Sequence, residues 1–331
     1  MKTSRIYHVY DSHTAGNSTR LLLEGVPALA GRSVRERRMD FQRNHDYIRT
    51  TLTQEPRGNS GILAVLVSPS DPNADYGVIF SDYRGYVDVC IHGTIGVVTT
   101  LVECGLVPEK ILKLRAVVLE TSAGLVKTRF RFSNGKVESV TVRNVPSFFL
   151  KNTQIELPRF GKVEVSISFG GNFYAYVDAK DLKLKIEPSN LRNLLYSARS
   201  LLEELKNTRV RHPLLPDINE IVGVSFYEDL GPNLARNVMI AEEDLFDRSP
   251  CGTGTCGRVA LLHATGRMKT GETLRNRSII GTEFLGTISS ETKVKNLRAI
   301  VPEITGSAFL TGISDLIVSE GDGLANGFMI R

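Results

Sequence analysis

Apolar and polar residues alternate along much of the chain, and this pattern predicts many short strands interrupted by a few helices. Ser4–Tyr10 alternates in this way and precedes a polar turn at Asp11–Gly16. Strands also dominate from residue 112 to residue 149, with a hairpin turn at Ser133–Gly135. Further strands are predicted by short apolar or alternating runs, which occupy residues 62–67, 77–80, 163–168, 173–178, 221–227 and 237–240.

Helical spacing marks four segments. Residues 21–49 show it around a Gly/Pro turn, and Pro188–Leu205 is clearly amphipathic. Two other helices are predicted to be buried. The first follows Cys90 and ends at Gly105, a plausible C-terminal cap, and the second runs over Gly252–Gly266. The body of the first is apolar almost all round, and a helix of that kind belongs in the centre of a domain.

These two helices belong to an internal repeat. Cys90-Ile-His-Gly-Thr-Ile-Gly96 returns 161 residues later as Cys251-Gly-Thr-Gly-Thr-Cys-Gly257, without a gap. The same offset also pairs Leu101 with Leu262 and Gly105 with Gly266. We therefore expect two similar domains, each with one cysteine at the start of a helix, in a fold that brings the two cysteines together. The predicted N-terminal domain spans 1–150, completed by the last strands at about 310–331, and the C-terminal domain spans 151–310.

Length and composition fit two ordinary globular domains. A chain of 331 residues can form two cores, and 41% hydrophobic with 23% charged residues is typical. The net charge of +5 is mild, so we expect no nucleic-acid partner. No apolar stretch is long enough to span a bilayer, and no apolar segment of a signal peptide follows the basic N-terminus. We therefore expect a cytoplasmic protein without a membrane partner.

A cysteine at the start of a helix has a specific chemistry. The first N–H groups of a helix are unpaired and carry partial positive charge, so they lower the pKa of a nearby thiol and can bind a carboxylate. Two opposed helix starts would provide two thiols and one carboxylate site. Such an arrangement suits inversion at a carbon atom: one thiolate removes a proton from one face, and the other thiol donates a proton to the opposite face. Donors around the carboxylate would stabilise the enolate-like charge.

Other interpretations of the cysteines remain open. A single cysteine beside a buried helix is more often a small core residue, and we assign Cys104 and Cys256 to packing. A zinc site formed by Cys90, His92, Cys251 and Cys256 is possible by ligand type, although the spacing is unusual. A disulfide between Cys90 and Cys251 would represent oxidative inactivation.

His92 and Asp247 are the polar candidates near the cysteines. His92 lies on the first helical turn after Cys90, and Asp247 precedes Cys251 by four residues, where a carboxylate could hold a substrate ammonium. The alternatives are an orienting hydrogen bond for His92 and a turn-forming role for Asp247. His13 could line the site or belong to a turn.

At these residues the chain resembles the proline racemase family, which includes 4-hydroxyproline 2-epimerases. The most specific match is Asp247-Arg-Ser-Pro-Cys-Gly-Thr-Gly-Thr255. Other matches cover nearly the whole chain, at residues 11–16, 55–58, 77–80, 90–96, 120–124, 170–173, 177–179 and 278–281.

The resemblance implies a diaminopimelate-epimerase-like α/β fold: two pseudosymmetric domains, each a curved sheet around a central helix, with the active site between them. It implies an isomerase that racemises proline or epimerises 4-hydroxyproline without any cofactor or metal, with Cys90 and Cys251 as the two acid/base residues. Asp247, with His92, would bind the ring nitrogen. It also suggests a homodimer. The substrate carboxylate would be held by backbone groups of Ile91, His92, Gly252 and Thr253.

Five positions depart from the family pattern. Ile91 replaces the usual glycine, Asn17-Ser18 replaces Glu-Pro, and Cys256 replaces serine. Ala241 occupies a position where proline racemases often carry an aromatic residue, which predicts a roomier pocket. Both cysteines are present, whereas the family's trans-3-hydroxyproline dehydratases lack one. That dehydratase activity, a non-catalytic imino-acid-binding protein and a metal-dependent hydrolase are the alternative functions.

Overall fold

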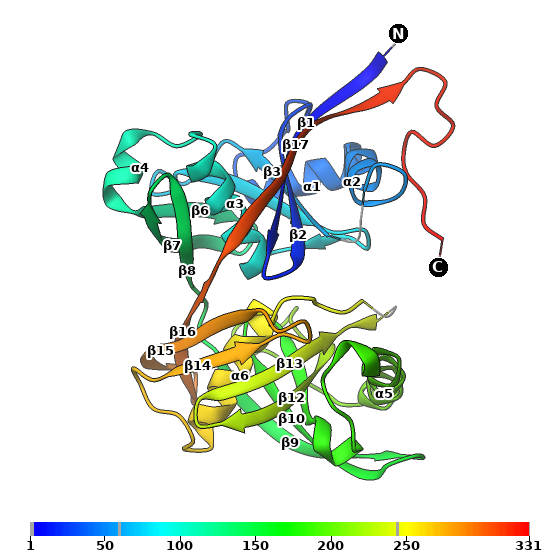
Figure 1. Ribbon diagram of the computed structural model, residues 1–331, viewed down its shortest axis with the longest axis vertical. Coiled ribbons are helices and arrows are strands. Elements are labelled where there is room, and N and C mark those ends of the chain that lie inside the picture. Colours follow the sequence, from blue (N-terminus) through cyan, green and yellow to red (C-terminus); the bar gives the residue numbers. More distant parts are fainter. Residues whose placement is uncertain (1–2, 59–60, 243–244, 331) are drawn as a thin grey trace. The chain divides into compact units, whose positions relative to one another are not determined.

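The computed structural model describes residues 3–58, 61–242 and 245–330 and divides the chain into two compact units (Figure 1). Unit 1 comprises Met1–Val142 and Ser307–Arg331, and unit 2 comprises Arg143–Gly306. The boundaries predicted at 150 and 310 fall inside strands β9 (Phe148–Leu157) and β17 (Ala308–Ser319). The units separate earlier in both cases, between Val142 and Arg143 at the end of β8 (Lys136–Arg143) and between Gly306 and Ser307 directly after β16 (Leu297–Gly306).

Unit 1 is a mixed sheet with four helices. Its strand order is β17-β1-β2-β3-β4-β6-β7-β8, with the short β5 also paired to β4. The pairs β2–β3 and β4–β6 are parallel, and the others are antiparallel. The elements are β1 (Thr3–Thr14), β2 (Asn17–Glu24), α1 (Val34–Asn44), α2 (Asp46–Thr53), β3 (Ile62–Val67), β4 (Tyr76–Ser81), β5 (Tyr86–Val87), α3 (Ile91–Glu103), α4 (Glu109–Leu114), β6 (Ala116–Thr121), β7 (Gly124–Ser133) and β8 (Lys136–Arg143).

Unit 2 is a sheet whose strands follow one another in chain order from β9 to β16. The pairs β11–β12 and β13–β14 are parallel, and the others are antiparallel. The elements after β9 are β10 (Gly161–Phe169), β11 (Phe173–Asp178), η1 (Ala179–Leu182), η2 (Pro188–Asn190), α5 (Leu191–Leu205), β12 (Ile221–Gly231), β13 (Leu234–Ile240), α6 (Gly252–Ala264), β14 (Thr273–Arg277), β15 (Glu283–Val294) and β16 (Leu297–Gly306).

The two sheets have the same pattern of pairings. From β17 to β8, and from β9 to β16, two antiparallel pairs are followed by a parallel, an antiparallel and a parallel pair, and then by two more antiparallel pairs. Helices fill the corresponding crossovers, with α3 after β4 and α6 after β13. The predicted pseudosymmetric α/β architecture is therefore confirmed. Unit 1 differs in that its first strand in space, β17, is the last in the chain.

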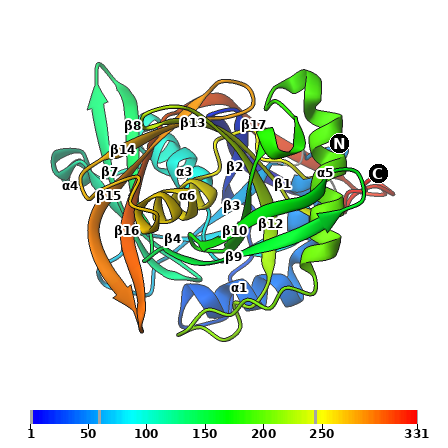
Figure 2. The ribbon, with the colours of Figure 1, turned by 90° about the horizontal axis from the view of Figure 1, so that it is seen from below.

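The central helix of each unit is buried. Every residue of α3 from Ile91 to Val102, and of α6 from Gly252 to Leu262, is inaccessible to solvent or nearly so. Helix α6 contacts β9, β10 and β11 near one end of its sheet and β15 and β16 at the other, so the sheet curves around it (Figure 2). Close packing requires Gly257, because a Cβ atom there would lie 2.2 Å from the Tyr176 hydroxyl. No helix in the described ranges is long and apolar enough to cross a membrane.

Three local predictions were wrong. Leu21–Glu24 belongs to strand β2, and the first helix begins only at Val34, because pairing with β1 and β3 outweighs the helical spacing of the leucines. The polar segment Asp11–Gly16 is mostly strand, since β1 continues to Thr14. Residues 109–114 form the short helix α4, which extends into the region predicted to be all strand.

Candidate active site

Cys90 is the N-terminal cap of α3. Its backbone is extended (φ −136°), and its Sγ accepts a hydrogen bond from the N–H of Gly93 at 3.4 Å. Its carbonyl accepts the N–H of Thr94 at 2.8 Å. The first N–H groups of an α-helix have no carbonyl partner one turn earlier, and Ile91 is the first residue of α3. This helix start therefore places a thiol at the positive end of the helix dipole.

His92 contacts the Cys90 thiol directly. Its Nδ1 lies 3.4 Å from Cys90 Sγ, and its Nε2 lies 3.1 Å from Nδ2 of Asn17. Its carbonyl accepts the hydroxyl proton of Thr14 at 2.9 Å. Asn17 and Thr14 flank the turn between β1 and β2, so this hairpin fixes the imidazole beside the thiol. The orienting role that we considered for His92 is thus present, and the ring is also placed to exchange a proton with sulfur.

Cys251 caps α6 in the same way but with a different backbone. Its Sγ accepts the N–H of Gly254 at 3.4 Å, yet its φ is +57°. A non-glycine residue there is strained and must be held by its surroundings. The preceding carbonyl, of Pro250, accepts hydrogen bonds from Asn237 Nδ2 and Thr255 Oγ1, both at 2.9 Å. The Cys251 N–H itself donates to the Ser249 hydroxyl at 3.2 Å.

Asp247 is buried close to the second helix start. Its Oδ1 accepts the N–H and the hydroxyl proton of Ser249, at 2.9 and 2.8 Å. The turn-forming role of Asp247 is therefore real, but it occupies only one carboxylate oxygen. Within the described residues Oδ2 makes no hydrogen bond, so it can accept one from a ligand.

The pKa of Cys251 is raised, against our expectation for a thiol at a helix start. Burial is the main cause, and the negative charge of Asp247 adds to it, while the N–H of Gly254 acts in the opposite direction. The free energy lost when a thiolate is removed from water exceeds the stabilisation that one helix N-terminus provides. Cys251 is therefore a thiol at neutral pH unless a ligand supplies positive charge.

Two tyrosines on β11 contact the start of α6, and the sequence pattern did not predict that they would belong to the site. The hydroxyl of Tyr174 lies 2.7 Å from Thr253 Oγ1, which in turn lies 3.8 Å from Cys251 Sγ. The hydroxyl of Tyr176 donates to the Gly254 carbonyl at 2.7 Å. Their run of aromatic and apolar residues predicted only a buried strand, because which helix it covers depends on tertiary packing.

The candidate residues fall into two groups, one in each unit. Unit 1 places Cys90, Ile91 and His92 together, and unit 2 places Asp247, Cys251, Gly252 and Thr253 together. All four cysteines are free thiols, and Cys256 is fully buried, as expected for packing. In the part of the chain that is described, no group of three or more His, Cys, Asp or Glu side chains is arranged to hold a metal ion.

Two further candidates have local roles. His13 accepts the N–H of Gly16 at 3.2 Å, so the turn interpretation applies to it. Ala241 is buried, and its N–H donates to the Leu245 carbonyl at 2.8 Å. Ile240 and Phe246 form a β-bridge, and Asp247 follows directly. The Asp247 N–H donates to the Met239 carbonyl at 2.9 Å, so Ala241 and Asp247 lie on either side of the Ile240–Phe246 bridge.

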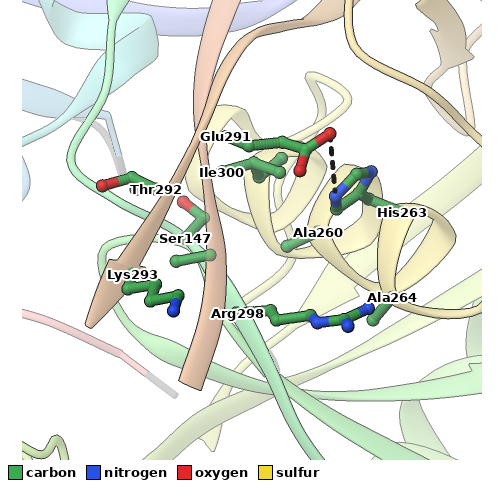
Figure 3. A pocket seen from close by; sticks show the side chains of 10 residues that line it. Ser147, Ala260, His263, Ala264, Glu291, Thr292, Lys293, Arg298 and Ile300 are labelled. Carbon is green, nitrogen blue, oxygen red and sulfur yellow. Dashed lines mark ion pairs between the residues drawn. The ribbon is translucent and has the colours of Figure 1, made fainter. Parts of the chain in front are cut away.

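A pocket of about 640 Å³ lies toward the opposite end of α6 (Figure 3). Its wall includes His263 and Glu291, whose Nε2 and Oε1 atoms are 3.8 Å apart, together with Lys293 and Arg298 from the β15–β16 hairpin. Twelve residues of helix separate His263 from Cys251, about 18 Å along the axis. This pocket therefore does not include the thiols.

Comparison with known proteins matches the whole chain. The family model described as "Proline racemase" matches residues 9–329. A proline racemase of Clostridioides difficile is 40% identical over 338 residues, and a 4-hydroxyproline 2-epimerase of Streptosporangium roseum is 37% identical over 334 residues. A trans-3-hydroxy-L-proline dehydratase of Bacillus cereus is 36% identical over 335 residues. All three alignments cover 100% of this chain and 100% of the relative.

A solved structure has the same fold. The hydroxyproline epimerase from Agrobacterium vitis, determined with bound trans-4-hydroxy-L-proline, superposes with a TM-score of 0.89 and 32% identity. The match covers 100% of this chain and 97% of that chain. The fold is thus the diaminopimelate-epimerase-like fold that the resemblance implied. With the family model and full-length relatives in agreement, the chain belongs to the proline racemase family of isomerases.

Proposed function

We propose that this protein inverts the α-carbon of proline or 4-hydroxyproline, with Cys90 and Cys251 as its two acid/base groups. The observation that carries the proposal is the equivalence of the two thiols. Each caps a buried helix of 13 residues, and each Sγ accepts the N–H of the residue three positions later at 3.4 Å. The proposal requires the two thiols to reach opposite faces of one substrate carbon.

The reaction removes one proton and adds one proton, and the two cysteines supply both steps without any other reactant. One cysteine, as thiolate, removes the α-proton and becomes a thiol. The other, as thiol, donates its proton to the opposite face of the planar carbanion and becomes a thiolate. The product has the inverted configuration, and the enzyme has exchanged the protonation states of its two cysteines. The same site then accepts the other enantiomer with the roles reversed.

Charge stabilisation has to supply much of the rate. Positioned acids and bases alone contribute roughly 10²–10⁴-fold. The carbanion formed next to a carboxylate places its charge on the carboxylate oxygens, and we assign the N–H groups of Ile91, His92, Gly252 and Thr253 to those oxygens. These N–H groups belong to the first two residues of α3 and of α6, at the positive ends of two helix dipoles.

The ring nitrogen has one suitable partner in unit 2. Oδ2 of Asp247 is a buried acceptor, and a protonated secondary amine carries two N–H donors and a positive charge. Binding it would also offset the negative charge that raises the pKa of Cys251. Because Ala241 is small where proline racemases often carry an aromatic residue, we propose that it leaves room for the hydroxylated ring.

The test is exchange in deuterium oxide under reducing conditions. L-proline and trans-4-hydroxy-L-proline are incubated separately, and inversion is followed by polarimetry while proton NMR reports deuterium at the α-carbon. We expect both signals with at least one substrate, and the faster substrate identifies the preferred ring. Cys90→Ser and Cys251→Ser should lose racemisation, and Cys256→Ser, on the same helix as Cys251, should retain it. Full activity of Cys251→Ser would rule out the two-thiol mechanism.

Two other functions give different products in the same assay. Dehydration of trans-3-hydroxy-L-proline, the activity named for the Bacillus cereus relative, would release a pyrroline without forming the enantiomer. The presence of both cysteines favours inversion over this reaction. A non-catalytic binding protein would be stabilised thermally by proline, and no deuterium would enter the α-carbon. The homodimer and the cytoplasmic location expected from the sequence stay predictions, to be checked by sedimentation and cell fractionation.

A further inference from the structure

A chain of two hydroxyl groups leads from strand β11 to the sulfur of Cys251. Tyr174 and Thr253 are in hydrogen-bond contact at 2.7 Å, and Thr253 Oγ1 lies 3.8 Å from Cys251 Sγ. All three side chains are buried, with 4%, 8% and 3% of their surface exposed. Water therefore has little access to this chain, and the side chain of Asn172 is a further hydrogen-bond partner of Tyr174.

The direction of the hydrogen bonds follows from the state of the sulfur. A thiolate can only accept, so Thr253 donates to it and in turn accepts the proton of Tyr174. A thiol can donate to Thr253, whose proton then points to the tyrosine oxygen. Hydroxyl groups both donate and accept, and they rotate at little cost. The same pair of side chains can therefore bond to Cys251 in either protonation state.

We propose that Tyr174 is a positioning residue for the reaction, acting through Thr253 to hold Cys251 in both of its protonation states. This inference rests on the proposed function, in which Cys251 must be a thiol in one direction and a thiolate in the other. A fixed cation would favour only the thiolate, and a fixed carboxylate only the thiol. A reversible hydroxyl chain favours neither strongly, and consecutive hydrogen bonds in a dry environment strengthen one another.

The other groups around the sulfur do not provide this function. Asp247 is negative and favours the thiol, and the N–H of Gly254 is a fixed donor that favours the thiolate. The hydroxyl of Tyr176 is already engaged with the Gly254 carbonyl. Burial keeps the pKa of Tyr174 well above its ordinary value, so its proton stays in place over the working pH range.

The experiment measures the thiolate of Cys251 directly. Wild-type protein and Tyr174→Phe are alkylated with iodoacetamide between pH 7 and 9.5, and mass spectrometry follows the peptide that contains Cys251. We expect the variant to react several-fold more slowly at every pH, because a hydrogen bond to a charged group is somewhat stronger than one to a neutral group, so the thiolate loses more than the thiol. A purely structural effect would have the opposite sign, because looser packing exposes the sulfur and speeds alkylation.

Tyr176→Phe is the matched control. It removes a buried tyrosine hydroxyl from the same strand and the same helix start, but that hydroxyl bonds to a backbone carbonyl. Its Cys251 alkylation profile should overlay that of the wild type. An unchanged or faster profile for Tyr174→Phe, or an equal slowing in both variants, would overturn the proposal.

A double-mutant cycle tests the path through Thr253 and covers the case that Tyr174→Phe fails to fold. Thr253→Val alone should slow alkylation at least as much as Tyr174→Phe, and the double variant should be no slower than Thr253→Val. Additive effects would mean that the tyrosine does not act through Thr253. None of these readouts needs turnover, so a failure of the proposed function would show separately, as absent deuterium exchange in the wild type. In an active enzyme, Tyr174→Phe should lower kcat with little change in KM.

Discussion

The backbone of Cys251 stores strain that Cys90 does not, and replacing each cysteine by alanine and then by glycine should reveal it. At Cys90, with φ −136°, alanine is not strained, so the step from alanine to glycine combines the extra freedom of glycine in the unfolded chain with the preference of an N-cap for glycine over alanine. This step is the reference for the same step at Cys251. At Cys251, with φ +57° and ψ 107°, alanine keeps a strain of about 1–3 kcal/mol that glycine removes.

The strain at Cys251 therefore appears as a difference between the two positions. Both cysteines are N-caps, so the other effects of glycine are common to them, and the step from alanine to glycine should be about 1–3 kcal/mol more favourable at Cys251 than at Cys90. The loss of the thiol is common to both members of each pair and cancels. The sequence contains no tryptophan, so urea unfolding is best followed by far-UV circular dichroism, with equal m-values required of the four variants. If the step from alanine to glycine changes the free energy of unfolding equally at both positions, Cys251 is not strained and the argument from its backbone fails.

The remaining predictions concern the surroundings of Cys251. Asp247→Asn removes a negative charge that raises the pKa of this thiol, so at pH 8 its alkylation should be several-fold faster than in the wild type; an equal or lower rate would show that the carboxylate does not act on the sulfur. Ala241→Phe adds a bulky ring next to the Ile240–Phe246 bridge that precedes Asp247, and it should lower kcat/KM for trans-4-hydroxy-L-proline by about tenfold or more relative to proline, the discrimination typical of about one methylene group. Equal losses for both substrates would place Ala241 outside the ring pocket.

The internal repeat explains why so much of the site could be predicted from sequence. The motif after each cysteine is local, and α3 and α6 begin and end at positions related by the same 161-residue offset. Helix starts, burial and the contact between Sγ and the glycine N–H follow from those few residues. The helical spacing of residues 21–24 misled us because strand pairing on both sides of β2 decides their conformation.

The unpredicted parts are those that depend on distant contacts. Tyr174 meets Thr253 across 79 residues of sequence, and nothing in its own strand indicates which helix it will contact. The positive φ of Cys251 could not be predicted either, because positive φ values are usually signalled by glycine and this position is a cysteine. The raised pKa of this thiol also requires knowledge of its burial, which outweighs the helix start.

The repeated and unrepeated parts of the two helix starts correspond to different demands of the proposed reaction. Proton transfer to either face of a carbon needs the same chemistry twice, and the repeated cysteines, glycines and helix N-termini meet that need. The α-carbon of proline carries a carboxylate, a nitrogen and a ring carbon, which are unlike one another, so recognition cannot be symmetric. Accordingly, the Cys90 thiol is contacted by His92, which is bonded to Asn17. The Cys251 thiol is contacted by Thr253, which is bonded to Tyr174. Asp247 acts on the pKa of Cys251. It is not repeated, because the residue 161 positions earlier is Tyr86. On this view, exchanging the repeated cysteines should abolish inversion of every substrate, whereas a change at the unrepeated Ala241 should alter which substrate is inverted.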